Sequence, residues 1–154
     1  MRIAMSGDHR GAQAAKLLAE RLRRDGHEVE LFGETGEAMV DYPEPAYRVG
    51  KAVSEQKADL GLLICGTGIG MSIAANKVKG VRAAVVHDEL TAQISRSHND
   101  ANVLCLSADL LGQRLIESIV GVWIKTPFEG GRHARRLGKI TAIEEGKDPS
   151  RAEG

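Results

Sequence analysis

The segment LGLLIC, residues 60–65, is an almost unbroken apolar run, and glycines follow it at positions 66, 68 and 70. A strand buried on both faces has this composition, whereas a strand with one face in water alternates apolar and polar residues. Strands buried on both faces occur mainly in parallel sheets that helices cover on each side. The segment therefore predicts an α/β fold, provided that the rest of the chain supplies the helices and further strands.

Strand-like and helix-like segments alternate along the rest of the chain. We expect further strands at 2–6, 28–32, 82–87 and 102–107, and helices at 12–25, 44–56, 70–77, 89–97, 110–125 and 132–146. This alternation predicts a parallel sheet joined by right-handed crossovers. The expected fold class is an α/β protein, a three-layer αβα sandwich with a five-stranded parallel sheet.

The 154 residues suffice for one domain, which we place at 1–146, and the polar segment 147–154 is expected to be a disordered tail. Basic and acidic residues number 21 each, so the chain has no net charge to attract nucleic acid or a membrane surface. We expect no signal peptide and no membrane span. Two cysteines without metal-ligand spacing indicate reduced thiols and a cytoplasmic protein.

Polar and reactive side chains follow two of the predicted strands. Asp8 and His9 come after the first strand, and Cys65 ends the apolar run. An Asp-His pair is often a turn or a helix cap, a cysteine is often a small core residue, and glycines often serve a tight turn. Ligands of such sheets bind at the carboxyl ends of the strands, which favours a site at this edge. For Cys105, inside VLCLS, we expect a buried hydrophobe.

The glycine loop matches no nucleotide-binding motif in full. A dinucleotide fingerprint requires G-x-G-x-x-G, and Met71 stands where the third glycine would be, although Asp88 lies near the position of the motif's acidic residue. A P-loop requires a lysine followed by serine or threonine, which is absent here. We therefore expect backbone amides at a helix start that could hold a phosphate or an oxyanion forming on a substrate.

Two further polar groups lie in the C-terminal half. The segment SHNDAN places His98 and Asn99 at the end of a predicted helix, so their position relative to the glycine loop depends on tertiary structure. The segment EGGRHARR places Arg132 and Arg136 on one face of the last predicted helix. Such arginines are often only a solvated helix face, but paired guanidinium groups also suit a phosphate better than a single lysine does.

Five segments, in this order, resemble the ribose-5-phosphate isomerase B family of the wider ribose/galactose phosphate isomerases: GDHRG, DYP, ICGTGIGMSIAANK, SRSHNDANVL and EGGRHARR. The resemblance extends from Arg2 to about Glu145. It implies a Rossmann-like fold and a homodimer, or a dimer of dimers, with active sites at the subunit interface. It also implies an enzyme of the pentose phosphate pathway that uses no metal and no cofactor. The implied reaction is the aldose–ketose isomerisation of ribose 5-phosphate and ribulose 5-phosphate through an enediolate.

The resemblance also implies a role for individual residues. Cys65 would be the base that moves a proton between C1 and C2, and Thr67 with the loop amides would hold the enediolate. His98 would help to open the furanose ring, and Asp8 would bind sugar hydroxyls. The other implied substrate- and phosphate-binding residues are His9, Tyr42, Gly66, Gly68, Ile69, Gly70, Asn99, Arg132 and Arg136.

These residue types suit the implied chemistry. A proton next to a carbonyl is weakly acidic, so the enediolate must be stabilised as it forms, and fixed backbone amides can do this without reorganising. A thiol acts as a base only as its thiolate, an anion that a helix N-terminus stabilises.

At one position the chain departs from the family. Asp109 stands eleven residues after His98, where the family typically has a phosphate-binding arginine. An anion there would repel a phosphate dianion unless a cation such as Arg10 or Arg114 compensates, which leaves the preferred sugar open. The alternatives are the isomerase of another sugar phosphate, such as a tetrose or hexose phosphate, a nucleotide-binding module of the same layered fold, and a catalytically dead sugar-phosphate sensor.

Overall fold

The computed structural model describes residues 1–33 and 39–151. Five parallel strands form one sheet in the order β2-β1-β3-β5-β4, which confirms the predicted fold class. Their bounds are β1 Arg2–Gly7, β2 Glu28–Phe32, β3 Leu60–Cys65, β4 Ala83–Val85 and β5 Val103–Ser107. Every residue of β3 is buried, as its apolar sequence predicts.

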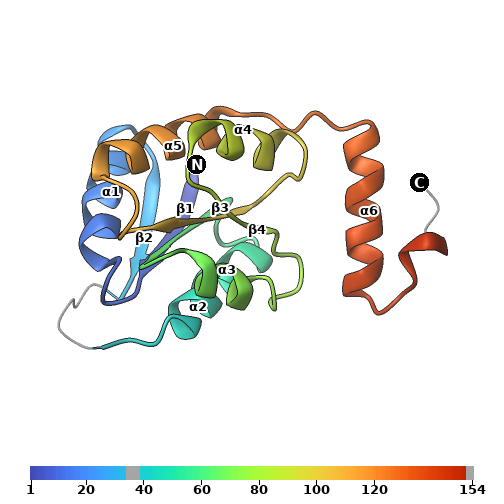
Figure 1. The fold of residues 1–154 in the computed structure, drawn as a ribbon, viewed down its shortest axis with the longest axis horizontal. Helices are drawn as coiled ribbons and strands as arrows, with labels where there is room; N and C mark the ends of the chain where they lie inside the picture. The colour runs from blue at the N-terminus through green and yellow to red at the C-terminus, as the bar shows by residue number, and fades with distance from the viewer. Residues whose placement is uncertain (34–38, 152–154) are drawn as a thin grey trace.

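Helices cover both faces of the sheet (Figure 1). Helices α1 (Ala12–Arg24), α4 (Glu89–Ser97) and α5 (Gln113–Lys125) pack on one face around the fully buried Trp123. Helices α2 (Pro43–Ser54) and α3 (Ile69–Ala75) pack on the other face, where Met71 and Cys105 are buried. Cys105 is therefore the core residue that the sequence predicts.

Two predicted elements differ in length from the observed ones by three residues, whereas the bounds of the others match or are shifted by one or two residues. Helix α5 begins at Gln113 and not at 110, because the hydroxyl of Ser107 holds the backbone N–H of Leu110 at 3.0 Å and Gly112 is extended. The intervening residues form a loop after β5. Strand β4 has three residues and not six, and soon after it the side chain of Asp88 caps α4.

The last helix, α6 (Arg132–Glu144), stands apart from the layers of the sheet (Figure 1). Its apolar side chains Ile140 and Ile143 are 46% and 60% exposed. The chain then forms a 3-10 turn at Pro149–Arg151 within the predicted tail 147–154, of which residues 152–154 lie outside the described residues. None of the described helices is long and apolar enough to cross a membrane.

The crevice that positions the site lies between β1 and β3. These neighbouring strands lead into helices on opposite faces, β1 into α1 and β3 into α3, and ligands of open α/β sheets bind where helices diverge in this way. The loop after β1 contacts the end of β3, since the backbone N–H of Asp8 donates to the carbonyl of Ile64 at 3.2 Å. A Cβ on Gly11 would overlap that same carbonyl, so only glycine fits there.

Candidate active site

The thiol of Cys65 lies at the carboxyl end of β3 and is 5% exposed. Its Sγ accepts a hydrogen bond from the backbone N–H of Gly68 at 3.1 Å. Gly68 has a φ of +79°, the left-handed region that favours glycine, and it turns the chain into α3. An N–H donor aimed at the sulfur stabilises a thiolate more than a thiol.

The rest of the glycine loop combines a fixed backbone with exposed side chains. The carbonyl of Gly66 accepts hydrogen bonds from the Ser107 hydroxyl at 2.6 Å and from the Asp109 backbone N–H at 3.1 Å. These bonds tie the loop to the end of β5. Thr67 and Ile69 are exposed, and the Thr67 hydroxyl accepts the backbone N–H of Ile69 at 3.3 Å.

Asp8 stabilises a local turn. The sequence allowed either such a turn or a contact with a ligand at this position. Its Oδ1 accepts the backbone N–H groups of Arg10 and Gly11, each at 2.9 Å. Its Oδ2 makes no hydrogen bond to any described residue, so one oxygen remains for a ligand. His9 is exposed and lines a cavity of about 340 Å³ between α1 and β2.

Tyr42 borders the same edge from the start of α2. Its ring packs on Gly70, where an added Cβ would lie 2.7–3.0 Å from the ring atoms. The structure therefore brings together, from the ends of β1 and β3 and the start of α2, the predicted residues Asp8, His9, Tyr42, Cys65, Gly66, Thr67, Gly68, Ile69 and Gly70.

Asp109 pairs with Arg10 at this edge. The Arg10 Nη2 lies 2.7 Å from Asp109 Oδ2, and Nε donates to Oδ2 at 2.9 Å. The hydrogen bonds with Asp109 raise the pKa of Arg10. Of the two cations that the sequence offers as compensation, Arg10 is the partner, and the ion pairs among the described residues do not include Arg114.

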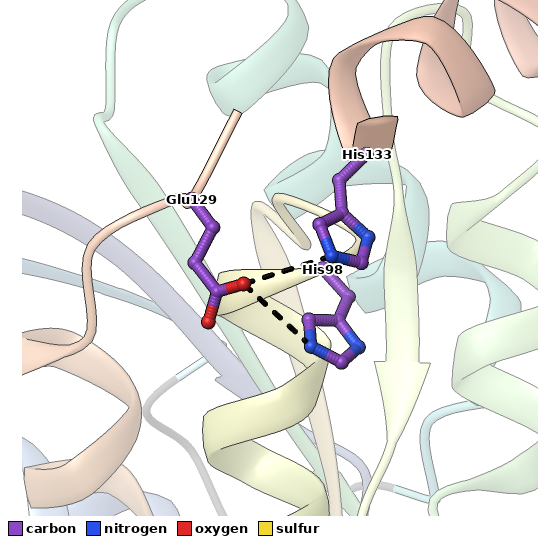
Figure 2. A group of neighbouring side chains, drawn as sticks. All are labelled: His98, Glu129 and His133. Carbon is purple, nitrogen blue, oxygen red and sulfur yellow. Dashed lines mark ion pairs between the residues drawn. The ribbon is translucent and has the colours of Figure 1, made fainter. Parts of the chain in front are cut away.

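A second polar cluster consists of His98, Glu129 and His133 (Figure 2). The two imidazole rings stack, with centroids 4.1 Å apart and planes at 10°. The carboxylate Oε2 of Glu129 lies 3.9 Å from His98 Nε2 and 3.6 Å from His133 Nε2. Burial of His133, and secondly the neighbouring His98, lower the pKa of the His133 imidazole.

These residue types can bind metals, and their ligand atoms lie within 4.8 Å of one another. The two ring planes are nearly parallel and stacked, however, whereas an ion bound by both imidazoles would have to lie close to both ring planes. Sequence reasoning assigned a role to His98 alone. Glu129 and His133 lie in the quoted segment EGGRHARR but were given no role, although their spacing of four residues beside the two arginines was a signal.

Within one chain the two groups lie at opposite edges of the sheet. Cys65 is level with Ser107, the last residue of β5, whereas His98 precedes the first residue, Val103. At about 3.3 Å per residue, β5 alone separates the two edges by roughly 16 Å. The predicted residues on the far side of this gap are His98 and Asn99 before β5, and the exposed Arg132 and Arg136 on α6.

The chain is similar to known proteins over nearly its whole length. The family model described as Ribose/Galactose Isomerase matches residues 3–140. Ribose-5-phosphate isomerase B of Escherichia coli (strain K12) is 43% identical over 144 residues, covering 94% of this chain and 97% of the relative.

Solved structures of ribose-5-phosphate isomerase B are also similar to this chain over nearly its whole length. Ribose-5-phosphate isomerase B of Clostridium thermocellum superposes with a TM-score of 0.93 at 46% identity, covering 95% of this chain and 99% of that one. The Mycoplasma genitalium ribose-5-phosphate isomerase B with bound ribulose 5-phosphate has a TM-score of 0.90 at 43% identity, covering 94% and 96%.

Proposed function

The chain belongs to the ribose/galactose isomerase family, and we propose a reaction mechanism in which its own residues move the proton. It is a sugar-phosphate aldose–ketose isomerase that interconverts ribose 5-phosphate and ribulose 5-phosphate, in line with its relative from Escherichia coli and the ribulose-5-phosphate-bound structure from Mycoplasma genitalium. The observation that carries the mechanism is the buried Cys65 thiol beside the Gly68 amide.

Cys65 acts as the base. Its thiolate takes the proton from C2 of the open-chain aldose and returns it to C1, and a second proton passes from the C2 hydroxyl to the C1 oxygen. C1 is thereby reduced and C2 oxidised within the same molecule. The step needs no external electron acceptor. The negative charge of the enediolate is stabilised by the Thr67 hydroxyl and by those backbone N–H groups of residues 66–70 that do not already donate to Cys65 or Thr67, and the loop that carries them is fixed before the reaction. The free Oδ2 of Asp8 binds a sugar hydroxyl.

His98 opens the furanose ring, and Asn99, Arg132 and Arg136 bind the sugar and its phosphate. Since these residues lie on the far side of the sheet from Cys65 in their own chain, a second copy supplies them. The proposed assembly is a homodimer in which each site combines the glycine loop of one protomer with His98 and α6 of its partner.

Exposed apolar side chains support this assembly. Ile140 and Ile143 on α6 have little of the same chain to pack against, and Ile69 and Ile73 on α3 are 54% and 59% exposed beside the glycine loop. A second copy that covers these surfaces removes apolar area from water, which favours association.

The proposed setting is cytoplasmic, within the pentose phosphate pathway. Cys65 and Cys105 are both free, which fits a compartment that keeps thiols reduced.

One observation favours a second candidate substrate. The Arg10–Asp109 pair places an anion beside the glycine loop, which could favour the hydroxyls of another sugar phosphate. Steady-state kinetics on phosphorylated tetroses, pentoses and hexoses separates the two. The proposal predicts the highest kcat/KM for ribose 5-phosphate, and a higher value for a tetrose or hexose phosphate would favour the alternative.

A further inference from the structure

The guanidinium of Arg10 has one of its two bidentate edges unoccupied. Asp109 binds the edge formed by Nε and Nη2, at 2.9 and 2.7 Å. A guanidinium carries five N–H donors in a planar fork, so Nη1 and the outer N–H of Nη2 remain for another ligand. No hydrogen bond between described residues engages Nη1, and the side chain is 55% exposed.

This free edge lies close to the proposed base. A Cβ on Gly66 would lie 3.0 Å from Arg10 Nε and 2.9 Å from Asp109 Oδ2. Gly66 directly follows Cys65, and consecutive Cα atoms are about 3.8 Å apart, so Arg10 Nε lies within about 8 Å of the Cys65 Cα. A five-carbon sugar phosphate has its reacting carbons at one end and its phosphate at the other, so a thiol and a cation at this separation can hold both ends.

Asp109 fixes the direction of the guanidinium. Its backbone N–H donates to the Gly66 carbonyl at 3.1 Å, so the carboxylate is attached to the glycine loop. A carboxylate on one edge of a guanidinium holds the opposite edge outward and removes the entropy cost of ordering a flexible side chain when a ligand binds. Its own negative charge then lies on the far side of the guanidinium from the ligand.

We propose that Arg10 contacts the phosphate of the substrate through its free edge and that Asp109 is the positioning residue for this contact. The inference rests on the proposed function and adds to it a phosphate contact from the β1–α1 loop, in the same protomer as the base. It also explains the aspartate at position 109. Arg10 supplies the cation that an arginine typically supplies at position 109 in the family, and Asp109 orients it.

The test compares Arg10→Ala and Arg10→Lys with the parent enzyme. A lost charge-assisted contact at an exposed site predicts a rise in KM for ribose 5-phosphate of about tenfold, with kcat within about threefold of the parent. Inhibition by inorganic phosphate should weaken in parallel, and Arg10→Lys should fall between the two. The matched control is Arg21→Ala, which breaks the similarly exposed Arg21–Asp25 pair on α1 and should change neither constant.

Asp109→Ala tests the positioning role. Without the carboxylate, the Arg10 side chain is no longer held in place, so KM should rise by roughly two- to fivefold while kcat stays unchanged. A fall in KM would overturn the positioning role, because it would mean that Asp109 competes with the phosphate for Arg10. Equal KM and equal phosphate inhibition in Arg10→Ala and the parent would overturn the proposal as a whole.

Direct titration with inorganic phosphate separates this inference from the proposed function. If the parent chain isomerises none of the sugar phosphates, the proposed function fails. The phosphate affinities of the parent and Arg10→Ala would still decide whether Arg10 binds the anion.

Discussion

At the scale of single residues, the proposed chemistry depends on one sulfur atom. Cys65→Ala removes the base and leaves the amides and the phosphate contacts in place, so kcat should fall by about 10²–10⁴-fold with little change in KM. Cys105→Ala is the control, because that thiol is fully buried on β5 and burial raises its pKa. The Cys105→Ala variant should keep the kcat of the parent. If Cys65→Ala retains more than about a tenth of the parent kcat, another group is the base.

A second residue-scale prediction concerns His98. If His98 opens the ring, His98→Asn should slow the turnover of ribose 5-phosphate more than that of a tetrose 4-phosphate, which has no free hydroxyl with which to close a furanose. The measurement is the ratio of kcat/KM for variant and parent on each substrate. Equal losses on both substrates would contradict the assigned role.

A third residue-scale prediction follows from the stacked histidines. Burial lowers the pKa of His133, so below the ordinary histidine value of about 6.5 the unfolded chain binds more protons than the folded one. The stability gained from the neutral imidazole is therefore present above about pH 6.5 and is lost as the pH falls. As the pH is lowered from about 7 to about 5, the midpoint temperature of thermal unfolding should fall more steeply in the parent than in His133→Gln. Parallel declines would contradict this assignment.

The sequence predicts the positions of some of these residues but not the contacts of others. The positions of Cys65 and Asp8 were predictable, because each lies at the carboxyl end of a predicted strand and the carboxyl ends of parallel strands meet at one edge. The contact between His98 and His133 was not predictable, because it depends on the path of the chain after α5, where the Glu129 backbone N–H bonds the carbonyl of Ser97. Asp109 was identified as an anomaly, and only the structure shows which cation binds it.

At the scale of elements, the crevice depends on the contact between the loop after β1 and the end of β3. In Gly11→Ala the new methyl group would meet the Ile64 carbonyl, which cannot move without breaking the sheet. We expect a loss of about 3 kcal/mol in the free energy of unfolding, measured by urea denaturation.

Gly121→Ala, in α5, is the matched control for this substitution. Apart from the backbone of its own helix and its chain neighbours, no atom lies within 4 Å of the added Cβ, and alanine should stabilise the helix by roughly 0.5–1 kcal/mol. Equal effects of the two substitutions would contradict the proposed role of Gly11.

The elements themselves were mostly predictable from periodicity. The bounds of β3 match the expected range, since a buried strand is set by its own apolar run, and those of β2 match as well, although none of its residues is buried. The start of α5 was not predictable, because the Ser107 hydroxyl and the extended Gly112 end the preceding loop by contacts that apolar periodicity does not reveal.

At the scale of the whole molecule, the described chain holds the proposed base and the proposed ring-opening and phosphate-binding residues in two separate groups. Periodicity predicts α6 as a helix but gives no position for it, because its partners are not neighbours in sequence. The fold of one chain was therefore predictable to a large extent, whereas the proposed combination of Cys65 with His98, Arg132 and Arg136 involves a second copy, which periodicity within one chain does not predict.

Subunit mixing tests this central claim most directly. Cys65→Ala and the double variant Arg132→Ala/Arg136→Ala should each be nearly inactive alone. If each site takes Cys65 from one protomer and the arginines from its partner, a mixed dimer has one intact site and one doubly altered site. Half of the randomly exchanged dimers are mixed, so an equimolar mixture should recover about a quarter of the parent activity. A mixture no more active than its separate components, after exchange has been verified, would contradict the shared site.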